Sequence, residues 1–163
     1  DYTFRIDAQV DGEVSRLVVS GVIDEHADLT VLKDSRGDVE VNLKGVRRIN
    51  SFGVRAWIDA IRKIPQSTRL VFVQCPPPVI DQMNMVAGFL GHGELRSFFA
   101  PMTCEECDEQ LEELFDVRKC RDLGGKLPLV PCPRCNRATR VGMSVNGSRR
   151  QRVCRRCKEA IGG

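Results

Sequence analysis

The first hundred residues alternate between short apolar runs and amphipathic stretches. Residues 17–23 form an apolar run that ends in a turn, and residues 39–43 alternate apolar with polar side chains, so both are expected to be strands. Residues 70–73 are continuously apolar, which is typical of a strand covered on both faces. A last short strand is expected at residues 95–99.

Helical spacing appears between these strands. Asn50 and Ser51 are both good N-cap residues, and Pro65 ends the segment that follows them. Within that segment, apolar residues recur on one helical face: Val54, Trp57, Ile58, Ile61 and Ile64. A second helix is expected over residues 79–89, which place a further apolar face before a group of glycines.

This order of elements predicts an α/β fold, with helices packed on a mixed sheet whose central strands are parallel. Near Ala100 and Pro101 the pattern changes, because most of the cysteines and many of the arginines follow this point. The expected organisation is therefore one domain over residues 1–100 and a small cysteine-rich region over residues 101–163.

Composition favours a globular chain with two differently charged parts. Of the 163 residues, 42% are hydrophobic and 29% are charged, and no run of apolar residues is long enough to cross a membrane. Residues 133–163 carry nine Lys or Arg against one acid, whereas the remainder is net acidic. The first eleven residues do not resemble a secretory signal, so a cytoplasmic location with reduced cysteines is expected.

Three short segments resemble the STAS family, which includes the anti-sigma-factor antagonists. Residues 21–24 followed by Ala27 resemble the family's strand-end turn into its first helix, and residues 39–46 resemble its central strand. Residues 49–54, Ile-Asn-Ser-Phe-Gly-Val, occupy the signature loop, which in the antagonists reads Asp-Ser-Ser or Asp-Ser-Thr before Gly. The resemblance covers about residues 1–100 and implies a STAS-like domain that docks protein partners around the helix after this loop.

The loop departs from the family pattern at the residue that matters for phosphorylation. In the antagonists the second hydroxyl residue accepts phosphate from a partner kinase, and that position is Phe52 here. Ser51 matches the first serine, which is not the acceptor, and is expected to cap the helix. The resemblance therefore implies docking without phosphorylation, through Asn50, Ser51, Phe52 and Gly53. Phe52 is expected either to be exposed as an apolar contact or to pack into the domain.

Six of the eight cysteines form three Cys-x-x-Cys pairs: Cys104/Cys107, Cys132/Cys135 and Cys154/Cys157. Such a pair supplies two ligands of a tetrahedral zinc site, and a hairpin brings a second pair to meet it. The first two pairs predict one ribbon, with residues 111–115 and 127–130 as its arms. The last two predict another, with Asn146-Gly147 as its hairpin turn. Residues 99–101, which lead into the first pair, resemble the start of a ribbon that follows STAS-like domains in some bacterial proteins.

The number of zinc ions stays open at one or two. Two ions would take eight ligands, or fewer with bridging thiolates; the region supplies seven cysteines including Cys120, and His92 or a water could complete the set. A redox dithiol or an iron–sulfur cluster are the alternatives to zinc. Cys75, which follows an expected buried strand, is interpreted as a small core residue. A closed four-thiolate site leaves no position for a reacting water, and no catalytic constellation is assembled, so the chain is not expected to be an enzyme.

Two functions fit these expectations. The first is a bacterial regulatory or scaffolding protein that docks protein partners through the STAS-like domain and the zinc ribbon, as part of a larger assembly or by self-association. The second is nucleic-acid binding through the basic tail, where the arginines that could contact phosphates are Arg149, Arg150, Arg152, Arg155 and Arg156. No aromatic residue for base stacking follows Pro133.

Overall fold

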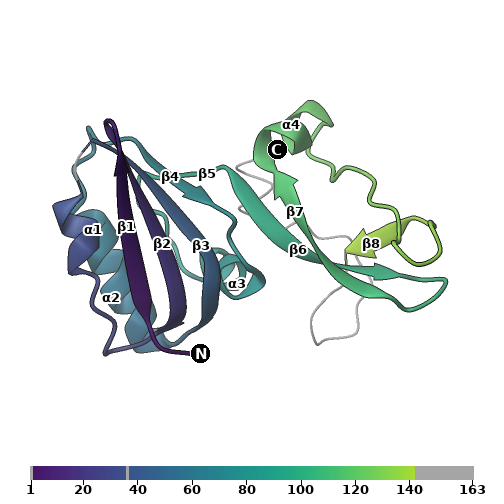
Figure 1. The fold of residues 1–163 in the computed structure, drawn as a ribbon, viewed down its shortest axis with the longest axis horizontal. Helices are drawn as coiled ribbons and strands as arrows, with labels where there is room; N and C mark the ends of the chain where they lie inside the picture. Colours follow the sequence, from purple (N-terminus) through teal and green to yellow (C-terminus); the bar gives the residue numbers. More distant parts are fainter. Residues whose placement is uncertain (1, 36, 142–163) are drawn as a thin grey trace.

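The computed structural model describes residues 2–35 and 37–141, which form a mixed α/β fold with two sheets (Figure 1). The first sheet has the strand order β1-β2-β3-β4-β5. β1 is antiparallel to β2, and the other neighbours are parallel. The strands are β1 (Arg5–Asp11), β2 (Val14–Ile23), β3 (Asp38–Ile49), β4 (Leu70–Val73) and β5 (Glu94–Leu95).

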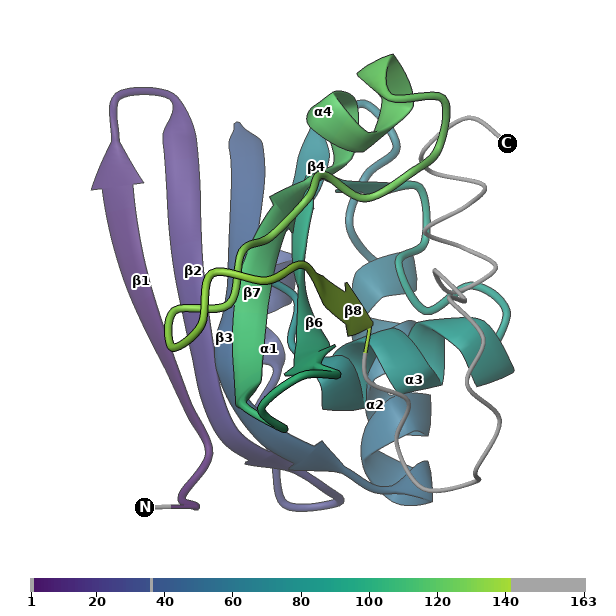
Figure 2. The same ribbon diagram turned by 90° about the vertical axis from the view of Figure 1, so that its right-hand side faces the viewer.

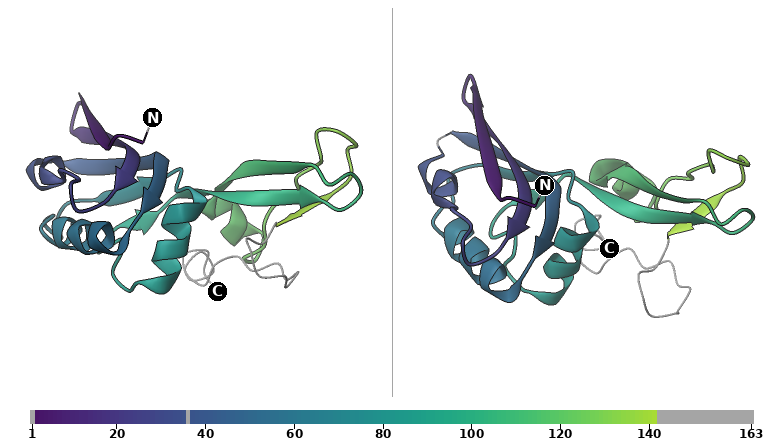
Figure 3. Two further views of the ribbon diagram at one scale, coloured as in Figure 1. Left: turned by 90° about the horizontal axis from the view of Figure 1, so that it is seen from below. Right: turned by 60° about the horizontal axis from the view of Figure 1, so that its bottom comes forward.

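Three helices cover one face of this sheet (Figure 3). They are α1 (Thr30–Asp34), α2 (Ser51–Arg62) and α3 (Pro77–Met85). Trp57 of α2 is fully buried, and its ring lies 5.7 Å from that of Phe89 and 6.3 Å from that of Phe72. Its indole N–H donates to the carbonyl of Phe89 at 3.0 Å, so the largest side chain of the core also satisfies its one polar atom. No helix in the described residues is long and apolar enough to cross a membrane.

The longer helix and the strands expected at residues 17–23, 39–43 and 70–73 are present, whereas the strand expected at residues 95–99 is divided at Arg96 between β5 and a longer strand that begins at Ser97. The runs 17–23, 39–43 and 70–73 lie in β2, β3 and β4, and Val54, Trp57, Ile61 and Ile64 of the predicted α2 segment are buried. α3 begins at Pro77 and ends at Met85, four residues short of the predicted end. β1 was not predicted, although Asp11-Gly12 follows an alternating stretch and is a strong hairpin signal.

The second sheet has the order β7-β6-β8 and is accompanied by a short helix. β6 (Ser97–Cys104) is its central strand, flanked by β7 (Gln110–Asp116) and β8 (Thr139–Val141), and α4 (Val117–Asp122) follows β7. The expected pairing of residues 111–115 with 127–130 is wrong. Residues 111–115 pair with β6 instead, because the loop between Cys104 and Gln110 returns the chain directly alongside the strand that precedes it.

One strand path connects the two sheets. After β5 pairs with β4, the N–H of Arg96 donates to Phe72 at 2.9 Å, and Cys75 exchanges hydrogen bonds with Ser97 and Phe99 at 3.2 and 2.8 Å. Phe98 and Phe115 then continue the apolar core into the second sheet, with their ring centroids 5.8 Å apart. The boundary expected at residues 100 and 101 falls inside β6, which extends away from the first sheet (Figure 1).

Gly53 allows the start of α2 to lie directly against the end of β2. A Cβ atom at this position would be 2.0 Å from the carbonyl oxygen of Ile23, far inside van der Waals contact with rigid backbone. The N–H of Asn50 also donates to that carbonyl at 3.2 Å. The position of the loop before α2 therefore requires a residue without a Cβ atom at position 53.

We expect Gly53→Ala to lower the free energy of unfolding by about 1–3 kcal/mol, because the clash outweighs the gain in helix propensity of about 1 kcal/mol. Urea denaturation measures the change. Ser51→Ala, at an exposed position in the same helical turn, is the control and should alter stability by less than about 0.5 kcal/mol. Equal stability of Gly53→Ala and the wild type would contradict the close contact.

Candidate metal centre and docking surface

The first cysteine pair lies in a tight turn at the end of β6. The N–H of Cys104 donates to the carbonyl of Glu109 at 2.9 Å, and the N–H of Asp108 donates back to the carbonyl of Cys104 at 3.0 Å. Asp108 has a φ of 58°, in the left-handed region that Asp and Asn tolerate better than most residues. This turn holds Cys104 and Cys107 on one side of the chain.

The second pair repeats this turn residue for residue. The N–H of Cys132 donates to Arg137 at 2.7 Å, and the N–H of Asn136 donates to Cys132 at 2.9 Å. Asn136 has a φ of 60° and takes the place of Asp108. The N–H of Arg134 also points at the sulfur of Cys132, at 3.4 Å. Two equivalent turns therefore present two cysteines each.

The four sulfur atoms converge. All lie within 4.8 Å of one another, and the Sγ atoms of Cys104 and Cys135, and of Cys107 and Cys132, are 3.5 Å apart. These separations are too long for disulfide bonds, in which the sulfurs are about 2.05 Å apart. A metal held tetrahedrally by four thiolates at about 2.3 Å has sulfur–sulfur edges of about 3.8 Å, and the observed cluster fits that figure. The four residues therefore suit one metal ion.

The thiols do not ionise equally. The N–H of Cys135 has the largest influence on Cys132, and with the N–H of Arg134 it outweighs burial and lowers the pKa of that thiol to about 7. The N–H of Glu109 lowers the pKa of Cys107, but burial and hydrogen bonds to the other three thiols raise it to about 12. In the absence of metal Cys132 therefore becomes a thiolate before Cys107, and a metal must displace the proton of Cys107.

Opposite charges join the two turns. The first is acidic and the second basic, and ion pairs cross between them: Arg140 to Glu105 at 3.5 Å and Arg134 to Glu109 at 3.9 Å. All four side chains are at least partly exposed, so each pair contributes only a few tenths of a kcal/mol up to about 1 kcal/mol. The pairing of β8 with β6 brings the two turns together, and these ion pairs add to it.

Of the other cysteine and histidine residues named from the sequence, three lie in the described residues and two lie outside them. Cys120 is fully buried in α4 and does not belong to the cluster; burial raises the pKa of its thiol. His92 is exposed, with its Nε2 2.9 Å from the carbonyl of Thr68, and Cys75 is fully buried, as expected of a core residue. Cys154 and Cys157 lie outside the described residues, as do the predicted phosphate-contacting arginines Arg149, Arg150, Arg152, Arg155 and Arg156.

The predicted docking loop lies at the start of α2. Asn50 is the N-cap, and its side-chain oxygen accepts from the N–H of Gly53 at 2.7 Å, so the prediction that Ser51 caps the helix is wrong. The amide of Asn50 also donates to Glu25 at 3.1 Å, which ties this loop to the end of β2. Ser51 is exposed, and 64% of the Phe52 surface is accessible.

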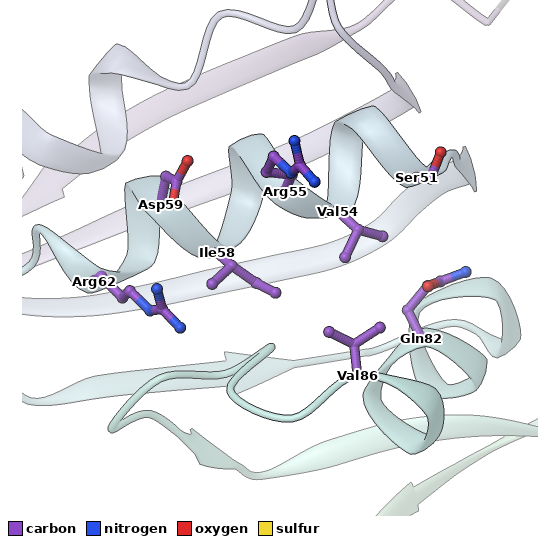
Figure 4. Close-up of a pocket in the computed structure, with 8 residues that line it drawn as sticks. All are labelled: Ser51, Val54, Arg55, Ile58, Asp59, Arg62, Gln82 and Val86. Carbon is purple, nitrogen blue, oxygen red and sulfur yellow. The ribbon is translucent and has the colours of Figure 1, made fainter.

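A groove begins beside this loop and runs between α2 and α3 (Figure 4). Val54 and Ile58 project from α2 toward Val86 and form its apolar part. Its volume is about 550 Å³, and polar or charged side chains border it: Ser51, Arg55, Asp59, Arg62 and Gln82. Sequence spacing placed Val54 and Ile58 on the apolar face of α2, but it did not indicate a groove there, since the groove depends on the distance between two helices.

We expect Cys135→Ser to reduce the metal content by one ion per chain, because it removes one of four ligands at an exposed position. Native mass spectrometry and elemental analysis measure the count. Cys120→Ala is the matched control, since Cys120 lies outside the cluster, and should keep the wild-type count. An unchanged metal count in Cys135→Ser would show that these four residues do not form the site.

No protein-family model matches this chain, and no curated protein matches it. The described structure and the physical chemistry of the two surfaces above are therefore the basis for inferring a function.

Proposed function

We propose that this chain is a non-catalytic regulatory or scaffolding protein that docks protein partners and whose second sheet is held by a structural zinc ion. The observation that carries the structural role of the metal is the closed set of four thiolates. Four protein ligands fill a tetrahedral site, so no position is left for a substrate or a reacting water. The metal then contributes to folding rather than to chemistry.

Zinc is the metal that this donor set favours. Four thiolates in two tight turns at the ends of hairpins are the usual structural zinc arrangement. The same four residues as a redox dithiol would need one pair to be accessible and reactive, whereas Cys104 and Cys132 are buried. Thiolates stay available for metal only in a reducing compartment, so the proposal places the protein in the cytosol.

We further propose that the first region is a STAS-like domain. The support is its mixed sheet with helices on one face, together with the position of residues 50–53 at the start of α2. The family resemblance makes this loop a docking surface, with Phe52 at the position of the phosphoacceptor. Phenylalanine has no hydroxyl group, so the proposed docking does not depend on phosphorylation.

The exposed ring of Phe52 and the adjoining groove suggest the chemistry of the partner. A large apolar side chain that is 64% exposed is a candidate anchor for a protein interface. The groove adds apolar surface from Val54 and Ile58, and Arg55 and Arg62 border it with positive charge. The proposed partner therefore presents an apolar pocket or side chain next to carboxylates.

The rival function, nucleic-acid binding, receives less support from the described part of the ribbon. Two of its arginines, Arg134 and Arg140, already pair with acids of the opposite turn. The acidic first turn would also repel phosphates at this end of the molecule. A salt titration with generic DNA and RNA tests the rival, since a steep decrease of binding with salt would support it.

We expect Phe52→Ala to lose the protein partner that the wild type captures from a cell extract of its source. Removing an aromatic anchor from an interface typically costs about 2 kcal/mol or more, which is at least about 30-fold in affinity. Quantitative mass spectrometry of the captured proteins measures the loss. Leu123→Ala, which removes another exposed apolar side chain, at the C-cap position after α4, is the control and should retain the same partner.

Ser51→Ala should capture that partner as well as the wild type does. The loss of the hydroxyl does not affect a contact that Phe52 makes without phosphate. The measurement is the same quantitative capture. Loss of the partner on Ser51→Ala, or stoichiometric phosphate on residues 50–53 after incubation with a serine kinase, would contradict phosphorylation-independent docking.

A further inference from the structure

β1 forms an open edge of the first sheet. It pairs with β2 on one side over seven residues, Arg5 to Asp11, and is the last strand in the sheet order. In Figure 2 it is the outermost strand, and no described element lies beyond it. An edge strand of this length presents a row of backbone N–H and C=O groups that can pair with another strand.

The turn at Gly12 and Glu13 determines which residues present those groups. A two-residue turn makes the flanking residues Asp11 and Val14 a hydrogen-bonded pair, and such pairs alternate along an antiparallel ladder. The odd-numbered residues of β1 therefore direct their backbone groups toward β2. The even-numbered residues, Ile6, Ala8 and Val10, direct theirs to the open edge.

The sequence of β1 is complementary to itself when a second copy is placed antiparallel with Ala8 opposite Ala8. Arg5 then faces Asp11 of the second copy, and Ile6 faces Val10. In this register Ile6, Ala8 and Val10 of one copy lie opposite Val10, Ala8 and Ile6 of the other. The backbone groups that each copy directs to its open edge can therefore hydrogen-bond to those of the other copy. Ile6 and Val10 share the helix-covered side of the sheet, because they pair with Val19 and Ser15, and both of those are buried.

Exposure and charge support this occupant over others. Val10 is 77% exposed, an unusual state for a valine in a strand, and Ile6 of a second copy would cover it. Arg5 and Asp11 are both exposed, and their present partners, Asp7 at 3.2 Å and Arg16 at 3.6 Å, are weak surface pairs. A parallel pairing in register would instead place Arg5, Asp7 and Asp11 opposite like charges.

We propose that this protein forms a symmetric dimer through β1, so that two five-stranded sheets join into one continuous sheet. Pairing along seven residues is a small interface, and a dissociation constant in the micromolar range is expected. This inference uses neither the metal centre nor the groove, so it can fail or hold independently of the proposed function.

Sedimentation velocity of the metal-loaded full chain over about 1–200 µM tests the dimer. The wild type should approach twice the 18.3 kDa of one chain as the concentration rises. Arg5→Asp should weaken association by about tenfold or more, because each of two symmetric attractive pairs becomes repulsive. Arg47→Asp makes the same charge change at an exposed position on β3 and should leave association unchanged.

The decisive variant is the exchange Arg5→Asp with Asp11→Arg. It reverses both charges and restores the attraction across the two-fold axis, so association should recover relative to Arg5→Asp alone. Thermal unfolding confirms that each variant is folded. A wild type that stays monomeric at about 200 µM, or an Arg5→Asp variant that dimerises as strongly as the wild type, would overturn the proposal. So would an exchange variant that does not recover.

Discussion

The register of β6 links the apolar core to the thiolate cluster. Along this strand every second side chain is buried, beginning with Phe98 and ending with Cys104. Phe98 packs in the core that is continuous with the first sheet, and Cys104 is one of the four clustered cysteines. Because side chains alternate between faces, a slip of one residue would turn Cys104 away from its partners and expose the apolar residues together. Core packing and metal geometry therefore select the same register.

The second sheet nevertheless has little apolar material of its own. β8 contributes three residues, and the connection from Leu123 to Ala138 contains few buried side chains, among them Val130 and Cys132. A segment of this size does not bury enough surface to fold alone. Hydrogen bonds fix each cysteine turn internally. The three-residue pairing of β8 with β6 and two exposed ion pairs join the turns, and the proposed metal would add four bonds between them. We therefore expect folding of residues 123–138 to be coupled to binding of the proposed metal, whereas β7 and α4 pack against the core that is continuous with the first sheet.

Sequence patterns predicted the elements that are determined by residues close together in the chain. The helix after Asn50 followed from its cap and apolar spacing, and the cysteine pairs followed from their separation. Two features were missed although local signals existed: β1, marked by Asp11-Gly12, and α4, marked by the N-cap Asp116 before the buried Val117 and Cys120. The pairing of β7 was wrong for a different reason. Strand partners depend on which segments meet in space, and a cysteine turn can connect adjacent strands as well as terminate them.

The proposed dimer contact and the proposed partner groove lie on separate parts of the first sheet and its helices. The strand order places β1 at one edge and β5, from which the second sheet continues, at the other. The groove lies on the helix-covered face between α2 and α3. A dimer through β1 would therefore leave both grooves open and would place the two metal centres at opposite ends of a ten-stranded sheet. Such a dimer would bind two copies of the proposed partner at a fixed spacing, and a bivalent partner would gain affinity from both contacts without any change in either.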